Sequence, residues 1–316
     1  MAGEGASDEL QRQQASIASL ERGGLPLAAQ ERIEELRQGK AAWTSDLTVA
    51  EMAAIHHAGF EPVGMVMGSS VFRIAAQWGY TSVFGVSGTA VAGGRVRTYP
   101  CPHGFFGFGV GSEHRTGYNW EHRYYEQGVT AARNAALVRI IEETRGLGAH
   151  GVVGVRILRH HLEGVGSSLE FTCIGTAVRR PGGPQLRTPF MSHLDGVSFS
   201  KLLHGGYVPV ALVMGIGAME IDPGCGTEWQ LRSWSNARLP QISEGIEEAR
   251  MLGISHLEAE IGAVDADGAV GVSTDFASYE LGGESNLVEL FLLGTAVRRY
   301  AKAPLDEPPL PIMRLR

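Results

Sequence analysis

The stretch Gly175-Thr-Ala-Val-Arg-Arg180 occurs a second time, unchanged, as Gly294-Thr-Ala-Val-Arg-Arg299. At ordinary composition, such a coincidence in a chain of 316 residues has odds on the order of one in a thousand. Upstream, Phe60-Glu-Pro-Val-Gly-Met-Val-Met-Gly68 matches Tyr207-Val-Pro-Val-Ala-Leu-Val-Met-Gly215 at five of nine positions. Because these anchors keep their order, duplication of one module explains them better than chance.

The first anchor follows a short predicted helix. Thr48 and Glu51 have the spacing of a capping box, in which both side chains satisfy free N–H groups at a helix start. We expect this helix to end near His57, with Gly59 in the left-handed conformation. Residues 198–204 form its counterpart. A strand follows in each copy, over 62–67 and 209–214.

Each copy then contains a longer helix and two strands. Apolar residues fall on one helical face in both copies, at Val129, Ala132, Ala136, Leu137, Ile140, Ile141 and Leu147, and at Ile242, Ile246 and Ala249. Gly148 and Gly253 are predicted to end these helices. Alternating apolar residues then predict two strands that pair as an antiparallel hairpin. The sequence therefore predicts an α+β fold of two tandem strand-helix-strand-strand modules.

Four boundaries follow from this pattern. A helical or flexible segment covers 1–44, with helices at 7–22 and 26–39. The first module covers 45–182 and carries an insertion at 81–125. The second module covers 190–302, and a proline-rich tail covers 303–316. Both ends are candidates for docking on a protein partner, through an amphipathic helix or a short linear motif.

Composition excludes several classes of function. A formal net charge of -7 argues against general nucleic-acid binding, which needs a basic face. The polar N-terminus has no secretory h-region, and no apolar run reaches the length of a membrane span. Three cysteines, Cys101, Cys173 and Cys225, form no disulfide framework and favour a reducing compartment. We expect a cytoplasmic protein.

The run Arg145-Gly-Leu-Gly-Ala-His-Gly-Val-Val-Gly-Val-Arg156, followed by Gly175-Thr-Ala-Val178, resembles the YbjQ family. The first copy matches over 126–180 and more loosely over 61–74. The second keeps its helix, Leu252-Gly253 and Gly294–Val297, while its turn over 253–258 has diverged. His150 departs from the usual Asn or Asp.

This resemblance implies a small module with the fold of a dodecin subunit that associates into closed rings, typically pentamers. The family carries a heavy-metal-binding label and has no agreed catalytic residues. We therefore expect a homo-oligomeric ring, with five copies as the typical number, in which a scaffold or binding role is favoured over an enzyme. Metal binding or metal sensing is the alternative.

The insertion contains the candidate metal ligands. A thiolate and imidazoles suit a divalent transition metal, and the set comprises Cys101, His103, His114 and His122. Their spacing matches no structural-zinc pattern, so a surface or interface loop is the simpler interpretation. In a ring, His160 and His161 at the hairpin turn could also gather around the axis.

The insertion is also rich in aromatic residues, which are typical of interface hot spots. The candidates for an oligomer or partner contact are Phe105, Phe106, Phe108, Trp120, Tyr124 and Tyr125. Burial in the domain, or stacking on a flat ligand, is the alternative. Gly146-x-Gly148-x-x-Gly151 follows a helix instead of a strand, so it is not a dinucleotide fingerprint. Cys173 lies on an apolar strand face and is predicted to be core.

Overall fold

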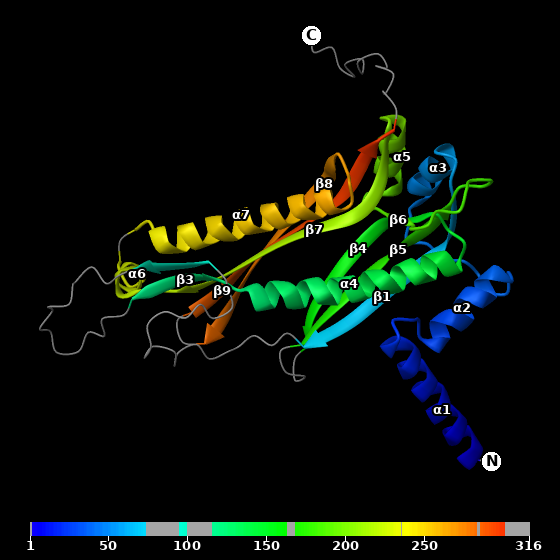
Figure 1. The fold of residues 1–316 in the computed structure, drawn as a ribbon, viewed down its shortest axis with the longest axis horizontal. Coiled ribbons are helices and arrows are strands. Elements are labelled where there is room, and N and C mark those ends of the chain that lie inside the picture. The colour runs from blue at the N-terminus through cyan, green and yellow to red at the C-terminus, as the bar shows by residue number, and fades with distance from the viewer. Residues whose placement is uncertain are drawn as a thin grey trace, which may run out of the picture.

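The computed structural model describes residues 2–73, 95–99, 116–162, 168–234, 236–282 and 285–300, and its fold is α+β (Figure 1). The first module comprises α3 (Val49–His57), β1 (Glu61–Arg73), α4 (Arg123–Gly146), β4 (Gly151–Leu162) and β5 (Ser168–Arg179). The second comprises α5 (Gly196–His204), β7 (Tyr207–Asp222), α7 (Pro240–Ala263), β8 (Gly268–Gly282) and β9 (Ser285–Arg299). The two modules follow the same order.

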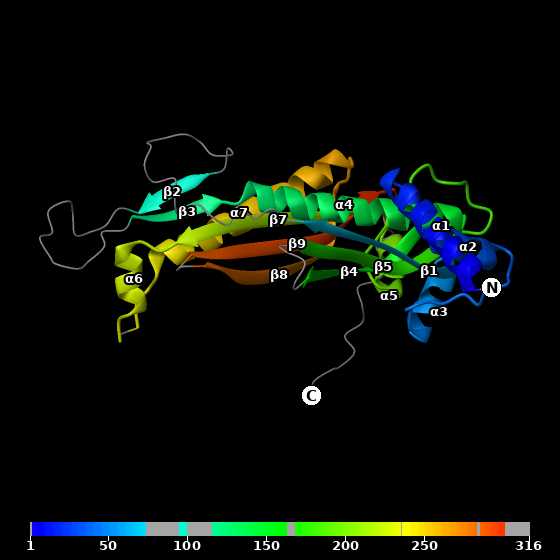
Figure 2. The same cartoon turned by 90° about the horizontal axis from the view of Figure 1, so that it is seen from below.

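Each module forms an antiparallel sheet covered by its long helix. The first sheet has the order β1-β5-β4-β6, where β6 (Phe190–Met191) pairs parallel to β4. The second has the order β2-β3-β7-β9-β8, with β2 (Val96–Tyr99) and β3 (Gly117–Glu121) contributed by the insertion. A further short helix, α6 (Cys225–Leu231), follows β7. Figure 2 shows β2, β3 and α6 together at one end of the molecule.

Equivalent residues make equivalent contacts in the two modules. The Glu143 carboxylate accepts the N–H of Met67 at 2.9 Å, and the Glu260 carboxylate accepts the N–H of Met214 at 2.8 Å. The predicted capping box at Thr48 is present, and Asp195 caps α5 at the matching position. The hydrogen bonds of Glu143 and Glu260 join each long helix to the first strand of its own module.

The helix and the sheet approach so closely that glycine is required. A Cβ added at Gly68 would lie 2.0 Å from the carbonyl oxygen of Ala136, and one added at Gly215 would lie 2.0 Å from that of Gly253. Gly68 and Gly215 occupy the same place in the two repeated anchors. The glycine that ends each anchor is therefore a packing residue.

The prediction that Gly253 ends its helix is wrong. α7 continues to Ala263, and Gly253 lies within it, where its backbone packs on β7. The residue that takes the place of Gly148 (φ 65°) is Asp265, at φ 52°. The turn after α7 has therefore not diverged. It keeps five residues in the register of the first copy: Ala266, Gly268, Val270, Gly271 and Val272 match Ala149, Gly151, Val153, Gly154 and Val155.

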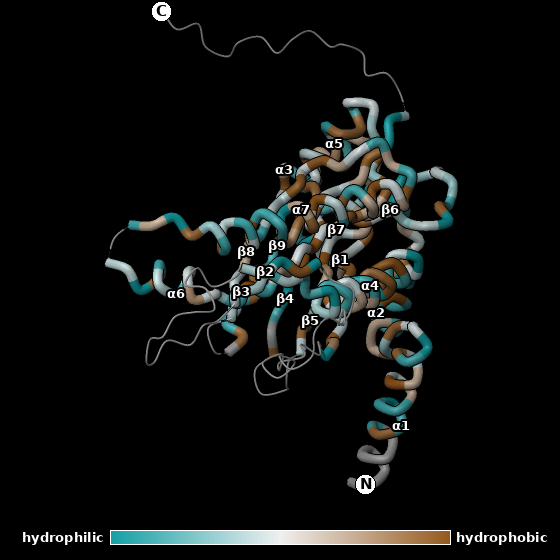
Figure 3. The backbone as a smooth tube through the Cα atoms, turned by 60° about the vertical axis from the view of Figure 1, so that its left-hand side comes forward, coloured by the Kyte–Doolittle hydropathy of each residue, from teal (hydrophilic) through white to brown (hydrophobic). Residues whose placement is uncertain are grey.

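Two helices precede the first module, as predicted. α1 (Ala2–Glu21) and α2 (Leu27–Arg37) are separated by Gly23 at φ 79°. α2 packs on α4 through Ile33, whereas α1 projects away from the body in Figures 1 and 3. The tail at 303–316 lies outside the described residues. Among the described helices, none has the length and apolarity needed to cross a bilayer.

The largest apolar core joins both modules. Val129 and Ile140 of α4 pack in the same cluster as Met214 of β7 and Phe291 of β9. The predicted core residue Cys173 is fully buried in this cluster. Burial of shared apolar area favours one cooperative body over two independent domains.

Candidate functional site

The structure places part of the predicted site residues at the junction between the modules. His122 follows β3, and Tyr125 lies in the first turn of α4. Of the other candidates, Cys101, His103, His114, Phe105, Phe106 and Phe108 lie outside the described residues. The part of the insertion that the structure describes does not stand apart as a surface loop, because β3 pairs antiparallel with β7 of the second module.

His122 is buried where α4 begins. Its ring packs against Trp120 and Tyr125, with centroids 5.6 and 6.2 Å away, and its Nε2 lies 3.9 Å from a Glu220 oxygen. Its Nδ1 is buried without a hydrogen-bond partner. Burial lowers the pKa of His122, so the neutral imidazole is favoured. Within the described ranges, no group of three or more His, Cys, Asp or Glu residues could hold a metal ion.

Two carboxyl groups flank this histidine. Burial, and then the charge of Asp222, raise the pKa of Glu220 to about 7. Burial also raises the pKa of Glu126, whose carboxylate accepts the backbone N–H of Ala218 at 2.8 Å. The backbone of His122 donates to the Ala218 carbonyl at 2.8 Å. The start of α4 therefore binds the outer edge of β7 like an added strand.

A second polar cluster lies deeper in the junction, around the fully buried Glu289 of β9. Tyr125 and Arg159 both donate hydrogen bonds to the Glu289 carboxylate, and Arg159 also binds Asp275 at 2.8 Å. The Arg159 guanidinium lies 4.0 Å from the centroid of the Phe291 ring. The charges of the two modules thus neutralise one another across the junction.

Electrostatics explain why this cluster stays paired. Burial, and then the negative charge of Glu289, raise the pKa of the Tyr125 hydroxyl far above its usual range, so it remains a donor. Burial alone would lower the pKa of Arg159, but the Glu289 carboxylate outweighs it and raises that pKa. The aromatic residue predicted as an interface anchor is therefore an anchor between modules of one chain.

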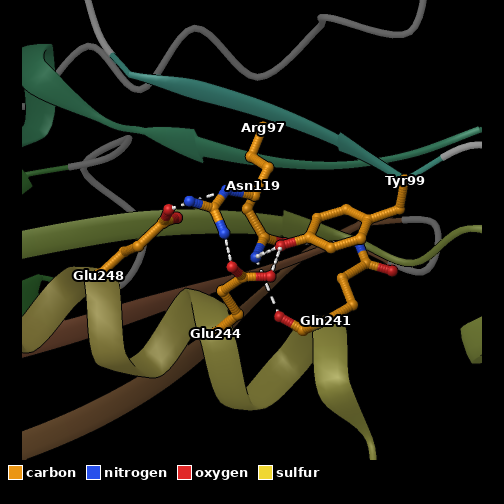
Figure 4. A network of polar contacts seen from close by, with 6 residues as sticks. All are labelled: Arg97, Tyr99, Asn119, Gln241, Glu244 and Glu248. Carbon is orange, nitrogen blue, oxygen red and sulfur yellow. Dashed lines mark hydrogen bonds and ion pairs between the residues drawn. The ribbon is translucent and has the colours of Figure 1, made fainter.

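The insertion hairpin is clamped onto α7 by a further network (Figure 4). Arg97 of β2 forms ion pairs with Glu244 and Glu248, and the Tyr99 hydroxyl donates to Glu244 at 2.7 Å. The Asn119 amide donates to the Tyr99 hydroxyl at 3.0 Å and to the Gln241 carbonyl at 2.9 Å. These contacts fix an element of the first copy on the helix of the second.

The remaining candidates lie apart from these clusters. Tyr124 is exposed on α4, and Trp120 is half-buried. His160 is exposed, and both His160 and His161 lie within β4, which extends to Leu162, not in the turn where we expected them. The structure describes no side-chain contact that joins His160 to His122.

The two short helices form another part of the junction. The rings of His57 and His204, which are equivalent residues, stack with centroids 5.5 Å apart and planes 13° from parallel. Phe60 contacts Phe190 and Phe199 edge-on, at 6.1 and 5.4 Å. Equivalent residues of the two modules therefore meet at the junction.

The cysteines do not match a redox or metal function in the described chain. Burial raises the pKa of the Cys173 thiol to about 12, so it is not a reactive thiolate. Cys225 begins α6 and is disulfide-bonded, which the sparse cysteine pattern did not predict.

Sequence reasoning missed Glu289, Arg159 and Glu220. Glu289 gives the only possible signal, because it interrupts the run Asn286-Leu-Val-Glu-Leu-Phe-Leu-Leu293 in a strand that is otherwise apolar. A charge within a buried strand requires a partner. Its partners come from α4 and β4 of the other module, which no local pattern reveals.

The fold is that of an α+β protein, and one part of the chain matches a YbjQ-type domain. The family model that matches residues 115–180 is described as "Putative heavy-metal-binding", and these residues contain α4, β4 and β5. The chain is also 34% identical over 272 residues to the encapsulin nanocompartment protein Rv1762c of Mycobacterium tuberculosis. That alignment covers 84% of this chain and 89% of the relative. The chain belongs to the family of this nanocompartment protein.

Proposed function

We propose that the chain is a non-enzymatic, self-assembling scaffold or binding protein of a protein nanocompartment. The observation that carries this proposal is the similarity to a nanocompartment protein over most of both chains. The junction supports it, because its buried polar groups are engaged in holding two modules together. A cytoplasmic location, which the sequence predicts, is part of this proposal, although the disulfide at Cys225 departs from the reducing compartment that the cysteine pattern favours.

We further propose that the second module is a second, diverged copy of the YbjQ-type domain. Its support is the set of equivalent contacts made by Glu143 and Glu260 and by Gly68 and Gly215, each within its own module. Duplication supplies the chain with two copies of one interaction surface, which is the simplest way to build a closed assembly.

Mass measurement tests the assembly. Light scattering on the purified full chain at micromolar concentration is expected to give a discrete multiple of 33.8 kDa. The family resemblance favours a ring, and a pentamer is the typical size that it implies. A monomer across the micromolar range would contradict the proposal.

The two ends of the chain are the proposed contacts with other nanocompartment proteins. α1 projects from the body, and the proline-rich tail at 303–316 has the composition of a docking segment. Removal of 303–316, or of 1–22, is expected to abolish association with nanocompartment particles without changing the mass of the protein's own oligomer. Unchanged association in both truncations would contradict this proposal.

Metal binding by the insertion is the second candidate, supported by the description of the matching family model. The ligands would be Cys101, His103, His114 and His122. Untagged protein is expected to contain stoichiometric zinc, copper or nickel by elemental analysis, and His122→Ala to reduce it. Metal-free protein whose melting temperature does not respond to these ions would contradict this function.

A further inference from the structure

The edge of β4 that does not pair with β5 is covered by residues 190–194, which lead into the second module. The N–H of Gly154 donates to the Leu194 carbonyl at 2.9 Å, and that of Val155 donates to the Ser192 carbonyl at 2.9 Å. Both donors lie in a β-bulge, where Gly154 takes φ 65° and the regular pairing with β5 is interrupted. The bulge therefore turns two adjacent N–H groups outward, and the second module satisfies them.

The equivalent bulge in β8 presents the same two donors to solvent. Gly271, also at φ 65°, and Val272 interrupt the pairing of β8 with β9. In the parts of the chain that the structure describes, neither residue is paired in the sheet register, and neither N–H donates to a turn or loop carbonyl. β8 is one of the two edge strands of its sheet, and an exposed edge with free donors is a template for pairing with another chain.

The edge residues of β4 are buried, whereas the equivalent residues of β8 are exposed. Val155 is 2% exposed, whereas Val272 is 44% exposed. The ring of Phe190 covers Gly151, but nothing lies within 4 Å of a Cβ added at Gly268, its counterpart. The His193 ring contacts the Gly271 carbonyl at 2.6 Å, but Gly268 and Val272 lack the cover that Gly151 and Val155 have.

The chain holds a segment equivalent to the cover, at residues 43–47. The Ser45 hydroxyl bonds the Thr176 hydroxyl at 2.9 Å, and the Leu47 N–H donates to Ser45 at 3.0 Å. In the second module, Ser192 and Leu194 make the same two contacts, at 3.2 Å each. Each segment is therefore fixed on its own module in the same way. Trp43, which stands where Phe190 does, is 49% exposed.

We propose that residues 43–47 of one copy add to the β8 edge of a second copy of this chain. The carbonyls of Ser45 and Leu47 accept the N–H groups of Val272 and Gly271, and Trp43 covers Gly268. The contact repeats the one between the modules, so it is parallel and head-to-tail. This inference rests on the proposed self-assembly and identifies its surface.

Two places distinguish the new interface from the internal one. Gly196 contacts Glu51 so closely that a Cβ there would lie 2.8 Å from it, and the counterpart of Gly196 is Val49. Arg32 of α2 binds Glu143 at 2.8 Å, where Arg133 of α4 binds Glu260 in the second module. Between copies, α3 and the neighbour's α5 must therefore lie slightly farther apart at Val49 than they do within one chain. In addition, α2 occupies part of the space that the neighbour's α7 would fill.

Cross-linking tests the register. Val152 and Met191 are paired across the internal contact, so Ala269 and Thr44 are paired between copies. The double variant Thr44→Cys/Ala269→Cys is expected to form covalent dimers and higher multimers under oxidation. The matched control, Val152→Cys/Met191→Cys, is expected to cross-link within one chain only. Cys173 does not interfere, because it is buried, and the single variants Thr44→Cys and Ala269→Cys show any cross-link formed through Cys101 or Cys225.

A pair of tryptophan variants tests the interface without cross-linking. Trp43→Ala is expected to weaken association about tenfold or more, because buried tryptophans dominate interfaces. Trp234→Ala, which removes another exposed tryptophan near α6, is expected to leave association unchanged. Both are measured by the concentration dependence of the mass in light scattering.

The outcomes separate this inference from the proposed function. A wild-type monomer overturns both. A wild-type oligomer whose Thr44→Cys/Ala269→Cys variant gives no intermolecular cross-link, and whose Trp43→Ala variant associates normally, overturns the inference alone. Intermolecular cross-links together with weakened Trp43→Ala association support it.

Discussion

At the scale of single residues, Glu289 carries the charge that links the modules. It is fully buried and binds Tyr125 and Arg159 from the other module. Its counterpart in β5 is Glu170, which is half-buried and, among the residues that the structure describes, has a long contact with Thr172 at 3.4 Å as its one side-chain hydrogen bond. The two glutamates occupy equivalent positions, but Glu289 is expected to contribute much more to stability than Glu170.

Glu289→Ala is expected to destabilise the protein by about 3–5 kcal/mol, because Arg159 loses its buried carboxylate partner and keeps only the exposed Asp275. Glu170→Ala is expected to change stability by less than about 1 kcal/mol. Thermal or denaturant unfolding of the two variants measures the difference. Equal losses of stability in both variants would show that Glu289 does not stabilise the junction between the modules.

The anchor glycines give a second pair of residues to compare. Gly68→Ala places a Cβ 2.0 Å from the Ala136 carbonyl, so the helix must move and stability is expected to fall by roughly 1–3 kcal/mol. Gly262→Ala, within α7 and with nothing inside 4 Å, is expected to gain up to about 1 kcal/mol from helix propensity. Melting temperatures that move in the same direction would contradict this assignment.

Cys173 provides a probe of the core. Because burial raises the pKa of its thiol to about 12, the thiolate is scarce at pH 8 and iodoacetamide cannot reach it. Peptide mapping after labelling is expected to find Cys173 unmodified in the folded protein and fully modified in denaturant. Rapid labelling under native conditions would mean that the core opens.

At the scale of elements, the sequence predicted what local periodicity determines. The capping box at Thr48, the apolar face of α4 and the hairpin of β4 and β5 are all present. The end of α7 was missed because Gly253 was taken for a helix terminator. A glycine serves equally for a close helix–sheet approach, and only the three-dimensional contact distinguishes the two uses.

The clamp between β2, β3 and α7 was beyond any local pattern, because its residues are separated by more than a hundred positions. Gln241 lies at its centre and donates to the Asp222 carbonyl at 2.8 Å, while accepting the Thr227 hydroxyl at 2.7 Å. Gln241→Ala is expected to cost about 1–3 kcal/mol. Amide exchange in β3 should accelerate.

The exposed Gln38→Ala serves as the control for that variant, since it loses only a surface contact with Glu34. If β3 exchanges equally slowly in both variants, the clamp does not hold the insertion hairpin on α7.

At the scale of the whole molecule, the candidate site could be predicted only in part. The aromatic insertion was recognised as a contact region, and Tyr125 is such a contact, but between modules of one chain. The partners of His122 and Tyr125 come from β7 and β9, so long-range topology determined them.

The shared core predicts how the molecule unfolds. Because α4 packs on strands of both modules, calorimetry of the full chain is expected to give one cooperative transition. Glu289→Ala should lower its midpoint without splitting it. Two separated transitions in the wild-type protein would indicate that the modules are independent domains.

The contact between β4 and residues 190–194 affects the number of modules in an assembled particle and the way in which the particle dissociates when the protein is diluted. If assembly repeats this contact, every closed particle contains an even count of modules, whatever its count of chains. Every second contact lies within one polypeptide, where its effective concentration is independent of the protein concentration. Dilution therefore separates whole chains at their β8 edges. The two modules of each chain stay in contact, so the separated chain keeps the geometry needed to associate again.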